Sequence, residues 1–414
     1  MSANNKPSSV GWAGLNGLQP GPLHDQIQAV LSTANFGQLE RVALLARTQH
    51  DKTADTTSLT CAIDPSSFAY GFNNIVLEVS FSDGVCWIAR IQHSPVDASE
   101  ARGNALGLLS EIATMRVVKE RTNIPVPQVF AYDVSPSNGV GCPYMLMERL
   151  PGRVLGHTSV SEVPPEHLAN VAKQFAHVLH QLQSLTFDRL GRLWRGETGD
   201  GPLEVIPVGV DSAASSNPTP HTSVEWFYME RQKHNRRTME SHPHDPEWIT
   251  ACSVLKAAVP HIIIEARVRG PFPLCHLDLH HGNLLFDDDY NLTGVLDWSQ
   301  AQTVPLERLV VSHEYITYPT SPQEINDSIR AFKALVHEHL QYLETMKHAA
   351  DSCSPPLGLL SDFFKFKRAE ITHRCTYSFP HRALWDGREV ARLIYGDEVT
   401  WDQLVRVYGQ REMY

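Results

Sequence analysis

The chain has 414 residues, of which 42% are hydrophobic and 20% charged, and a formal net charge of −11. This length is sufficient for two lobes around a large hydrophobic core. An apolar run of about 18 residues, long enough to span a bilayer, is absent, and the negative charge would repel nucleic-acid phosphates. We therefore expect neither a membrane span nor nucleic-acid binding.

The seven cysteines are scattered and form no C-x-x-C pair. This pattern indicates a reducing compartment and predicts neither a disulfide framework nor a zinc site. The first residues are polar and lack the apolar core of a signal peptide. We expect a cytoplasmic protein, and the sequence leaves the oligomeric state open.

Residues 1–60 are expected to form a helical N-terminal extension. Apolar spacing predicts helices over residues 26–36 and 39–46, followed by a polar link over residues 48–60. These helices would pack on the domain that follows or extend it.

Residues 61–150 are predicted to form a small, strand-rich domain. Alternating apolar residues in 74–81 predict a strand, a turn at 82–84 follows, and residues 85–91 form the partner strand of a β-hairpin. The buried face of the first strand would carry Ile75, Leu77, Val79 and Phe81.

A helix is predicted over residues 99–121, because apolar residues recur there at three-residue steps. Prolines at positions 125 and 127 end it. Two further strands are expected at 128–132 and 144–148, and a link at 149–152 leads to the next domain.

Residues 151–414 are predicted to be mainly helical. A helix begins at Pro164-Pro165-Glu166. Residues 196–223 are rich in small and polar residues, which predicts a long loop that could cover an acceptor site or be a simple surface insertion. Further helices are expected near 224–240, 247–264, 322–347, 357–374 and 387–409.

The most informative motif is His276-Leu-Asp-Leu-His-His-Gly-Asn283, a loop between two apolar runs. Phosphoryl transfer requires a carboxylate that orients the attacking hydroxyl and accepts its proton, and oxygen ligands for Mg²⁺. Asp278 suits the first role and Asn283 the second. We expect His276 to brace the loop rather than react.

A second β-hairpin is predicted after this loop, from two apolar runs separated by a polar turn. It would bring Asp297 back beside Asn283 as a second metal ligand. The acids Asp287, Asp288 and Asp289 could form a rival metal site, but they lack the glycine and spacing of a calcium loop. We interpret them as a solvated hairpin tip.

With Val295-Leu-Asp-Trp298, the motif resembles the aminoglycoside phosphotransferase and choline kinase-like family, in its fungal-type branch. The family pattern is close to H-G-D-L-H-x-x-N, an apolar run and I-D-W, and Leu277 departs from it. The resemblance implies an α+β, two-lobed protein kinase-like fold, with a small β-rich N-lobe and a larger, mainly helical C-lobe. It also implies use of Mg²⁺ and ATP, or GTP.

The resemblance further implies nucleotide contacts in the N-lobe. Arg90 occupies the position of the cation that grips the α and β phosphates, usually Lys, although a guanidinium differs from an ammonium in shape and reach. Glu111 would pair with it. The remaining nucleotide contacts would come from Ser67 in a short phosphate-covering loop, which could instead be the entrance to a strand, and from Met147, Glu148 and Leu150 around adenine.

The sequence thus predicts a small-molecule kinase that phosphorylates a hydroxyl group. A pseudokinase-type nucleotide-binding or regulatory module, and a nucleotidyl transferase on the same fold, remain alternatives. The net charge would suit a cationic acceptor. Candidate contacts to such an acceptor are acids near the C-terminus: Asp386, Glu389, Asp397, Glu398 and Asp402. The helix with Trp226, Tyr228 and Glu230 is another candidate. A basic cluster of Arg231, Lys233, Arg236 and Arg237 could instead face an acidic acceptor.

Overall fold

The computed structural model describes most of the chain, and the account below concerns those residues alone. They are residue 12, residues 14–50, 58–155, 163–208 and 219–315, residue 317, and residues 321–350, 359–364, 367–378 and 380–410. Among their helices, none is long and apolar enough to cross a membrane.

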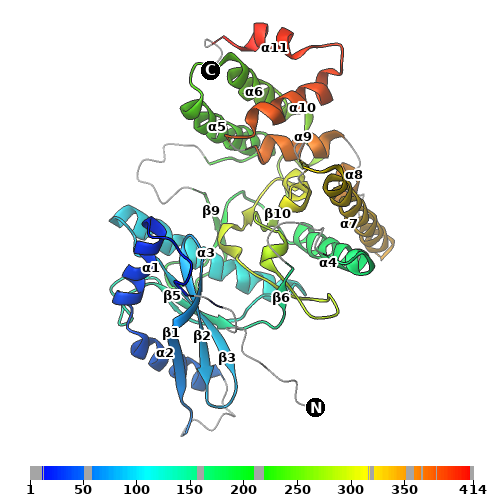
Figure 1. The fold of residues 1–414 in the computed structure, drawn as a ribbon. Coiled ribbons are helices and arrows are strands. Elements are labelled where there is room, and N and C mark those ends of the chain that lie inside the picture. The colour runs from blue at the N-terminus through cyan, green and yellow to red at the C-terminus, as the bar shows by residue number, and fades with distance from the viewer. Residues whose placement is uncertain are drawn as a thin grey trace.

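The N-terminal lobe is built on a five-stranded antiparallel sheet with the strand order β1-β2-β3-β5-β4 (Figure 1). The predicted hairpin is confirmed, since β2 pairs with β3 from Asn74 opposite Gln92 to Ser80 opposite Cys86. The strands are β1 (Cys61–Tyr70), β2 (Asn74–Phe81), β3 (Cys86–Gln92), β4 (Val129–Asp133) and β5 (Tyr144–Glu148).

Helices α1 (Pro22–Thr33) and α2 (Phe36–His50) pack on this sheet, so the N-terminal residues are part of the lobe's core. Ile27 and Leu39 from these helices are fully buried with the apolar side chains of β2. The alternation that predicted β2 is confirmed, because Ile75, Leu77 and Val79 all have no exposed surface.

Helix α3 (Ala98–Arg121) belongs to a different hydrophobic core from that of α1 and α2, and it packs between the sheet and the C-terminal lobe. Asp97 caps its N-terminus by accepting from the N–H groups of Ser99 and Glu100. Buried residues of α3 share one hydrophobic core with the C-terminal lobe, including Val295 and Trp298. The lobes therefore meet through packed side chains as well as through the chain link.

The C-terminal lobe is mainly helical, as predicted, and α5, α6, α9 and α10 form a bundle at the far end from the sheet (Figure 1). Short strands near the middle of the molecule carry the predicted catalytic loop. The helices are α4 (Pro165–Ser184), α5 (Ser223–Ser241), α6 (Pro246–Ala257), α7 (Gln323–Ala350), α8 (Leu360–Phe364), α9 (Lys367–Thr376), α10 (Ala383–Tyr395) and α11 (Trp401–Tyr408). The strands are β6 (Arg153–Val154), β7 (Thr186–Phe187), β8 (Arg192–Trp194), β9 (Glu204–Ile206), β10 (Phe272–Cys275), β11 (Leu284–Phe286), β12 (Leu292–Val295) and β13 (Gln302–Thr303).

Two of the predicted helices are interrupted in the structure. The helix predicted over 247–264 ends at Ala257, because Pro260 disfavours continuation. The helix predicted over 387–409 is two helices, separated at Gly396, whose φ of 74° is left-handed. Part of the predicted loop over 196–223 is strand β9, which pairs with β8, and residues 209–218 lie outside the described residues.

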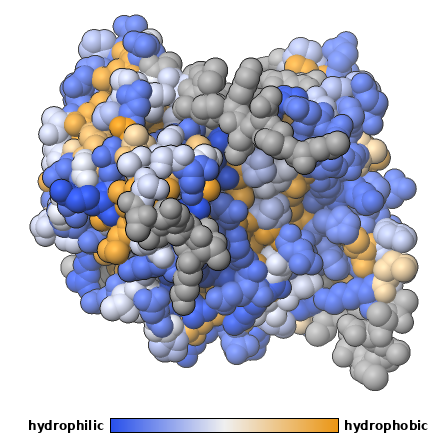
Figure 2. All heavy atoms as spheres, turned by 90° about the horizontal axis from the view of Figure 1, so that it is seen from below, coloured by the Kyte–Doolittle hydropathy of each residue, from blue (hydrophilic) through white to orange (hydrophobic). Residues whose placement is uncertain are grey.

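The surface seen from below is mainly hydrophilic, with apolar residues scattered among polar ones (Figure 2). Such a mixture is ordinary for a globular surface. The most exposed large apolar side chains include Phe72 in the β1–β2 turn and Val96 before α3.

Gly387 allows α10 to approach α6 closely. A Cβ at this position would lie 2.8 Å from both Cα and Cβ of Ala251. We predict that Gly387→Ala lowers the free energy of unfolding by about 1–3 kcal/mol, because overpacking outweighs the gain in helix propensity. Thermal unfolding would measure the change.

Gly107→Ala provides the matched control, since no atom lies within 4 Å of a Cβ built there in α3. It should raise the unfolding temperature, because alanine is the better helix former. Equal unfolding temperatures for the two variants would contradict the close packing of α6 and α10.

Candidate active site

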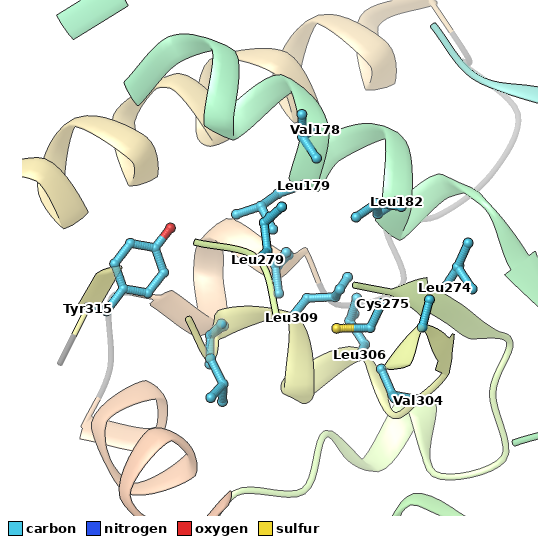
Figure 3. Close-up of a cluster of buried hydrophobic side chains, with 14 of the residues drawn as sticks. Val178, Leu179, Leu182, Leu274, Cys275, Leu279, Val304, Leu306, Leu309 and Tyr315 are labelled. Atoms are coloured by element: carbon cyan, nitrogen blue, oxygen red, sulfur yellow. The ribbon is translucent and has the colours of Figure 1, made fainter. Parts of the chain in front are cut away.

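In the predicted catalytic loop, residues 276–283, a buried leucine lies between two more accessible polar side chains. The loop follows β10, and Leu279 points into a core formed with Leu179 and Leu309 (Figure 3). Asp278 and His280, on either side of Leu279, are only half-buried. Burial of the central leucine therefore turns both polar neighbours toward the accessible side.

His276 braces this loop, as expected. Its side chain is buried and its Nε2 lies 2.8 Å from the carbonyl oxygen of Leu296, to which it donates. Its ring meets Trp298 edge-on at 4.7 Å between centroids. Burial lowers the pKa of His276, so the ring is neutral at pH 7. His276 thus connects the loop to the segment that carries Asp297.

Asp278 and Asn283 lie side by side. The Asn283 amide nitrogen donates to the Asp278 carbonyl oxygen at 2.9 Å and lies 3.4 Å from its carboxylate. His280 holds the pKa of Asp278 below its ordinary value, against the effect of burial, and His313 adds to this. Asp278 is therefore ionised at neutral pH.

A buried pair fixes the other end of the loop. Glu314 accepts from the backbone N–H of His281 at 2.8 Å, and the His281 ring nitrogen Nδ1 lies 2.7 Å from the same oxygen. Both side chains are buried. Beside them, Ser312 donates to the carbonyl oxygen of Leu279 at 3.0 Å. The side chains of Ser312 and Glu314 thus both hold the loop.

The predicted second hairpin is confirmed and brings Asp297 to Asn283. Strand β11 pairs with β12, and the N–H of Leu296 donates to the Asn283 carbonyl oxygen at 2.8 Å. Asp297 has a left-handed backbone, with φ 57° and ψ 68°, and its carboxylate accepts from the Ser299 hydroxyl at 2.7 Å. A conformation that is costly for a non-glycine residue is typical of functional sites.

The three acids at the hairpin tip are part of the turn. Asp287 accepts from the N–H groups of Asp289 and Asn291 at 3.0 and 2.7 Å. Asp288 and Asp289 are exposed. In the described part of the chain, no group of three or more His, Cys, Asp or Glu residues is arranged to hold a metal ion.

Arg90 and Glu111 form the ion pair that the sequence predicted. Arg90 Nη1 lies 2.5 Å from Glu111 Oε1, and the side chains are 13% and 3% exposed. Burial raises the pKa of the Glu111 carboxyl, while Arg90 and the nearby backbone N–H of Trp298 oppose this. Although burial opposes it, the charges of Glu111 and Asp297 raise the pKa of Arg90. Arg90 is therefore a permanent cation within electrostatic range of Asp297.

The position of Ser67 differs from the expected phosphate-covering loop. Residues 61–70 form strand β1, whose pairing with β2 is irregular between Ile63 and Phe68. Ser67 lies in this bulge, because burial of Phe68 draws the segment onto the sheet. The turn between the strands is formed by residues 71–73.

A cleft of about 580 Å³ lies beside Arg90, and Asn73 of that turn lines it. Its wall carries carboxylates, amides and hydroxyls from strands β2 and β3, from α3 and from the turn at residues 298–300. The lining includes Asn73, Asn74, Arg90, Asp97, Glu111 and Ser299.

The residues expected around adenine lie at the junction of the lobes. Met147 is buried in the shared core, opposite Ile88. The Glu148 side chain pairs with Lys119 at 3.0 Å, and its N–H donates to the Gln128 carbonyl oxygen. The Leu150 side chain packs close to Gly294 of β12, where an added Cβ would lie 2.8 Å away.

Two of the residues considered as acceptor contacts, Asp386 and Arg231, are buried and have structural partners. Asp386 is fully buried and pairs with Arg374 and Arg382 at 3.1 and 3.2 Å. Arg231 is buried and donates to the Cys375 carbonyl oxygen at 2.8 Å, so it does not belong to a surface basic cluster. Charge in the sequence alone could not separate these residues from acceptor contacts.

Sequence reasoning missed the contacts of His313 and Tyr377. His313 Nε2 lies 3.2 Å from Asp278 Oδ1, and Tyr377 lies against His313. They are far from Asp278 in the chain and follow no periodic pattern, so their proximity required the tertiary structure.

Comparison with known proteins assigns the family. A model of the phosphotransferase enzyme family matches residues 67–339. The chain belongs to this family. The matched stretch contains both the Arg90–Glu111 pair and the loop with Asp278, and the two-lobed kinase-like fold expected from the sequence is confirmed.

The chain is similar to a subtelomeric hrmA-associated cluster protein of Aspergillus fumigatus, with 31% identity over 124 residues, 30% of this chain and 23% of that protein. It is also similar to clavilactone A biosynthesis cluster protein Y of Ampulloclitocybe clavipes, with 27% identity over 262 residues, 59% of this chain and 62% of that protein. The chain spans less than two thirds of the length of these relatives.

Solved structures similar to this phosphotransferase-family chain include macrolide 2′-phosphotransferase MphH of Brachybacterium faecium. Its TM-score is 0.41 at 15% identity, covering 86% of this chain and 98% of that one. Another is a thermostable mutant of aminoglycoside phosphotransferase APH(4)-Ia with ADP and hygromycin B. Its TM-score is 0.44 at 14% identity, covering 83% and 95%.

Glu111 provides a stability test of the connection between the lobes. We predict that Glu111→Ala lowers the free energy of unfolding by about 3–5 kcal/mol, because it leaves the Arg90 guanidinium buried without its carboxylate. Thermal or urea unfolding would measure the loss.

Glu120→Ala is the control on the same helix, because Glu120 is exposed and pairs with Arg195 at 3.3 Å. A surface pair of this kind contributes about 0–1 kcal/mol. A loss for Glu111→Ala no larger than that for Glu120→Ala would show that the buried pair does not support the fold.

Proposed function

We propose that this protein transfers the γ-phosphoryl group of ATP, or GTP, to a hydroxyl of a small molecule, with Mg²⁺. The observation that carries the proposal is the meeting of Asp278, Asn283 and Asp297 near the buried Arg90–Glu111 pair. A carboxylate, metal ligands and a phosphate-binding cation are the components that phosphoryl transfer requires. Membership of the phosphotransferase enzyme family supports the same activity.

In this proposal, Asp278 orients the acceptor hydroxyl and accepts its proton as the oxygen attacks the γ-phosphorus. The bond between the γ-phosphorus and the β–γ bridging oxygen breaks, and the nucleoside diphosphate leaves. The lowered pKa of Asp278 keeps the carboxylate ionised, as orientation of the hydroxyl and acceptance of its proton both require.

Asn283 and Asp297 would hold Mg²⁺. Their oxygen donors suit this ion. The Asn283 amide nitrogen bonds to Asp278, which directs the amide oxygen away from that carboxylate. Mg²⁺, when bound, neutralises charge on the phosphates. Arg90 would bind the α and β phosphates, and Glu111 would keep its guanidinium in place.

Around adenine, Met147 would close the back of the pocket, and the backbone from Glu148 to Leu150 would meet the base edge. Because the Glu148 N–H already donates to Gln128, the Glu148 carbonyl and the Leu150 backbone are the better candidates. The turn at residues 71–73, rather than Ser67, would approach the phosphates, since Asn73 lines the cleft beside Arg90.

We predict that Asp278→Asn lowers turnover by about 10²–10⁴-fold, because the amide cannot accept the hydroxyl proton. Nucleotide affinity should change little, since Asp278 does not bind the phosphates. Transfer of labelled γ-phosphate from ATP to a panel of hydroxyl compounds would measure turnover, and product mass would separate added phosphate from added AMP. An AMP adduct would instead support a nucleotidyl transferase.

We predict that Asp297→Ala abolishes Mg²⁺-dependent stabilisation by ATP in a thermal-shift assay, because it removes a proposed metal ligand. Asp289→Ala at the exposed hairpin tip is the matched control and should retain the shift. Retention of the full shift in Asp297→Ala would remove this residue from the metal site. Absence of a nucleotide shift in the wild type would favour the pseudokinase alternative.

A further inference from the structure

A chain of polar contacts leads from the proposed catalytic carboxylate into the C-terminal lobe. Asp278 Oδ1 lies 3.2 Å from Nε2 of His313, and His313 Nδ1 lies 3.0 Å from the Tyr377 hydroxyl. The rings of His313 and Tyr377 meet edge-on, with 4.6 Å between centroids. Three distant parts of the sequence therefore meet at this carboxylate.

The chemistry of the three groups determines where the imidazole proton of His313 lies. A carboxylate only accepts, so the ring nitrogen that faces Asp278 Oδ1 at 3.2 Å, Nε2, must carry the proton. The other nitrogen of a neutral imidazole is an acceptor, so the Tyr377 hydroxyl donates to Nδ1. Burial lowers the pKa of His313 although the charge of Asp278 opposes this, and the ring is neutral. Tyr377 thereby selects the tautomer that can donate to Asp278.

The second carboxylate oxygen faces a similar donor. The N–H of Gly282 donates to Nδ1 of His280 at 3.0 Å, so the proton of this ring, when neutral, is on Nε2. That nitrogen lies 3.6 Å from Asp278 Oδ2 and also 3.2 Å from the amide nitrogen of Asn283, itself a donor, so it is less well placed than His313 to hold the carboxylate. Rotation of the Asp278 carboxylate would separate its oxygens from both rings, and the His313 contact is the shorter of the two.

The surroundings of His313 show why its side chain is not needed to hold the turn η7 (His313–Tyr315). Its neighbours Ser312 and Glu314 already bind the catalytic loop through Leu279 and His281. The His313 side chain is 35% exposed. The charged and titratable groups that act on it are Asp278, His280, Arg308 and Glu314, together with the Tyr377 hydroxyl.

We propose that His313, with its tautomer selected by Tyr377, is a positioning residue that holds the Asp278 carboxylate in the orientation needed for the acceptor hydroxyl. This inference rests on the proposed phosphotransferase function. Loss of the donor would let the carboxylate rotate, and a misplaced reacting group of this kind can cost about 10²-fold in rate. Nucleotide binding would change little, since the phosphate-binding Arg90 and the proposed metal ligand Asp297 do not belong to this chain of contacts.

Two amide substitutions distinguish the roles of the two ring nitrogens of His313. The side-chain nitrogen of glutamine reaches approximately where Nε2 lies, whereas that of asparagine reaches only the place of Nδ1. We predict that His313→Asn lowers kcat about 10–100-fold, that His313→Gln restores most of the loss, and that KM for ATP and the unfolding temperature change little in either variant.

Tyr377→Phe completes the experiment. It should lower kcat in the wild-type background, where His313 loses its tautomer preference. It should have no further effect in the His313→Gln background, where the amide donates without help. An equal loss in both backgrounds would overturn the proposal, as would a His313→Gln variant as slow as His313→Asn.

Nitrogen NMR of the histidine rings distinguishes failure of this inference from failure of the proposed function. The wild type should show His313 as the Nε2–H tautomer, and Tyr377→Phe should show a mixture. A tautomer mixture in the wild type would overturn the proposal even if phosphate is transferred. Absence of transfer to every acceptor, with the Nε2–H tautomer present, would refute the phosphotransferase function while confirming the chain of contacts.

Discussion

The two lobes of this protein are joined by the carboxylate of Glu111. It pairs with Arg90 from the N-terminal sheet and lies near the backbone N–H of Trp298, the residue after Asp297, which favours the ionised carboxylate. Either charge buried alone would cost several kcal/mol, so the pair and its hydrogen bond stay together. Helix α3, which belongs to the N-terminal lobe by sequence, thus helps to position Asp297 of the C-terminal lobe.

The catalytic loop depends on a different balance, between apolar burial and polar anchoring. Leu279 is held in the core (Figure 3). Its neighbours Asp278 and His280 are only half-buried. His276 and His281 then tie the two ends of the loop to Leu296 and Glu314. The bonds from His276 Nε2 to Leu296 and from the His281 N–H to Glu314 pair polar atoms that would otherwise be buried without partners, which is costly, so they also select one loop conformation.

Much of the fold could be predicted because it depends on neighbours in sequence. Alternating apolar residues in β2, three-residue apolar steps in α3 and the polar turn between β11 and β12 each specify a local structure. The prediction was less accurate where packing decided the outcome. Burial of Phe68 draws residues 61–70 into β1, although their composition suits a loop. Pro260 and Gly396 end helices that apolar spacing alone would extend.

The sequence by itself determined which chemical groups could serve the site, because Asp278, Asn283 and Asp297 occur in one short motif whose hairpin brings its ends together. It also indicated Arg90 and Glu111 through the resemblance to a kinase-like family. Only the tertiary structure decided which distant side chains meet these groups. His313 and Tyr377 lie against Asp278 because separate turns of the C-terminal lobe pack there. Contacts of this kind depend on the packing of whole elements and leave no periodic pattern in the chain.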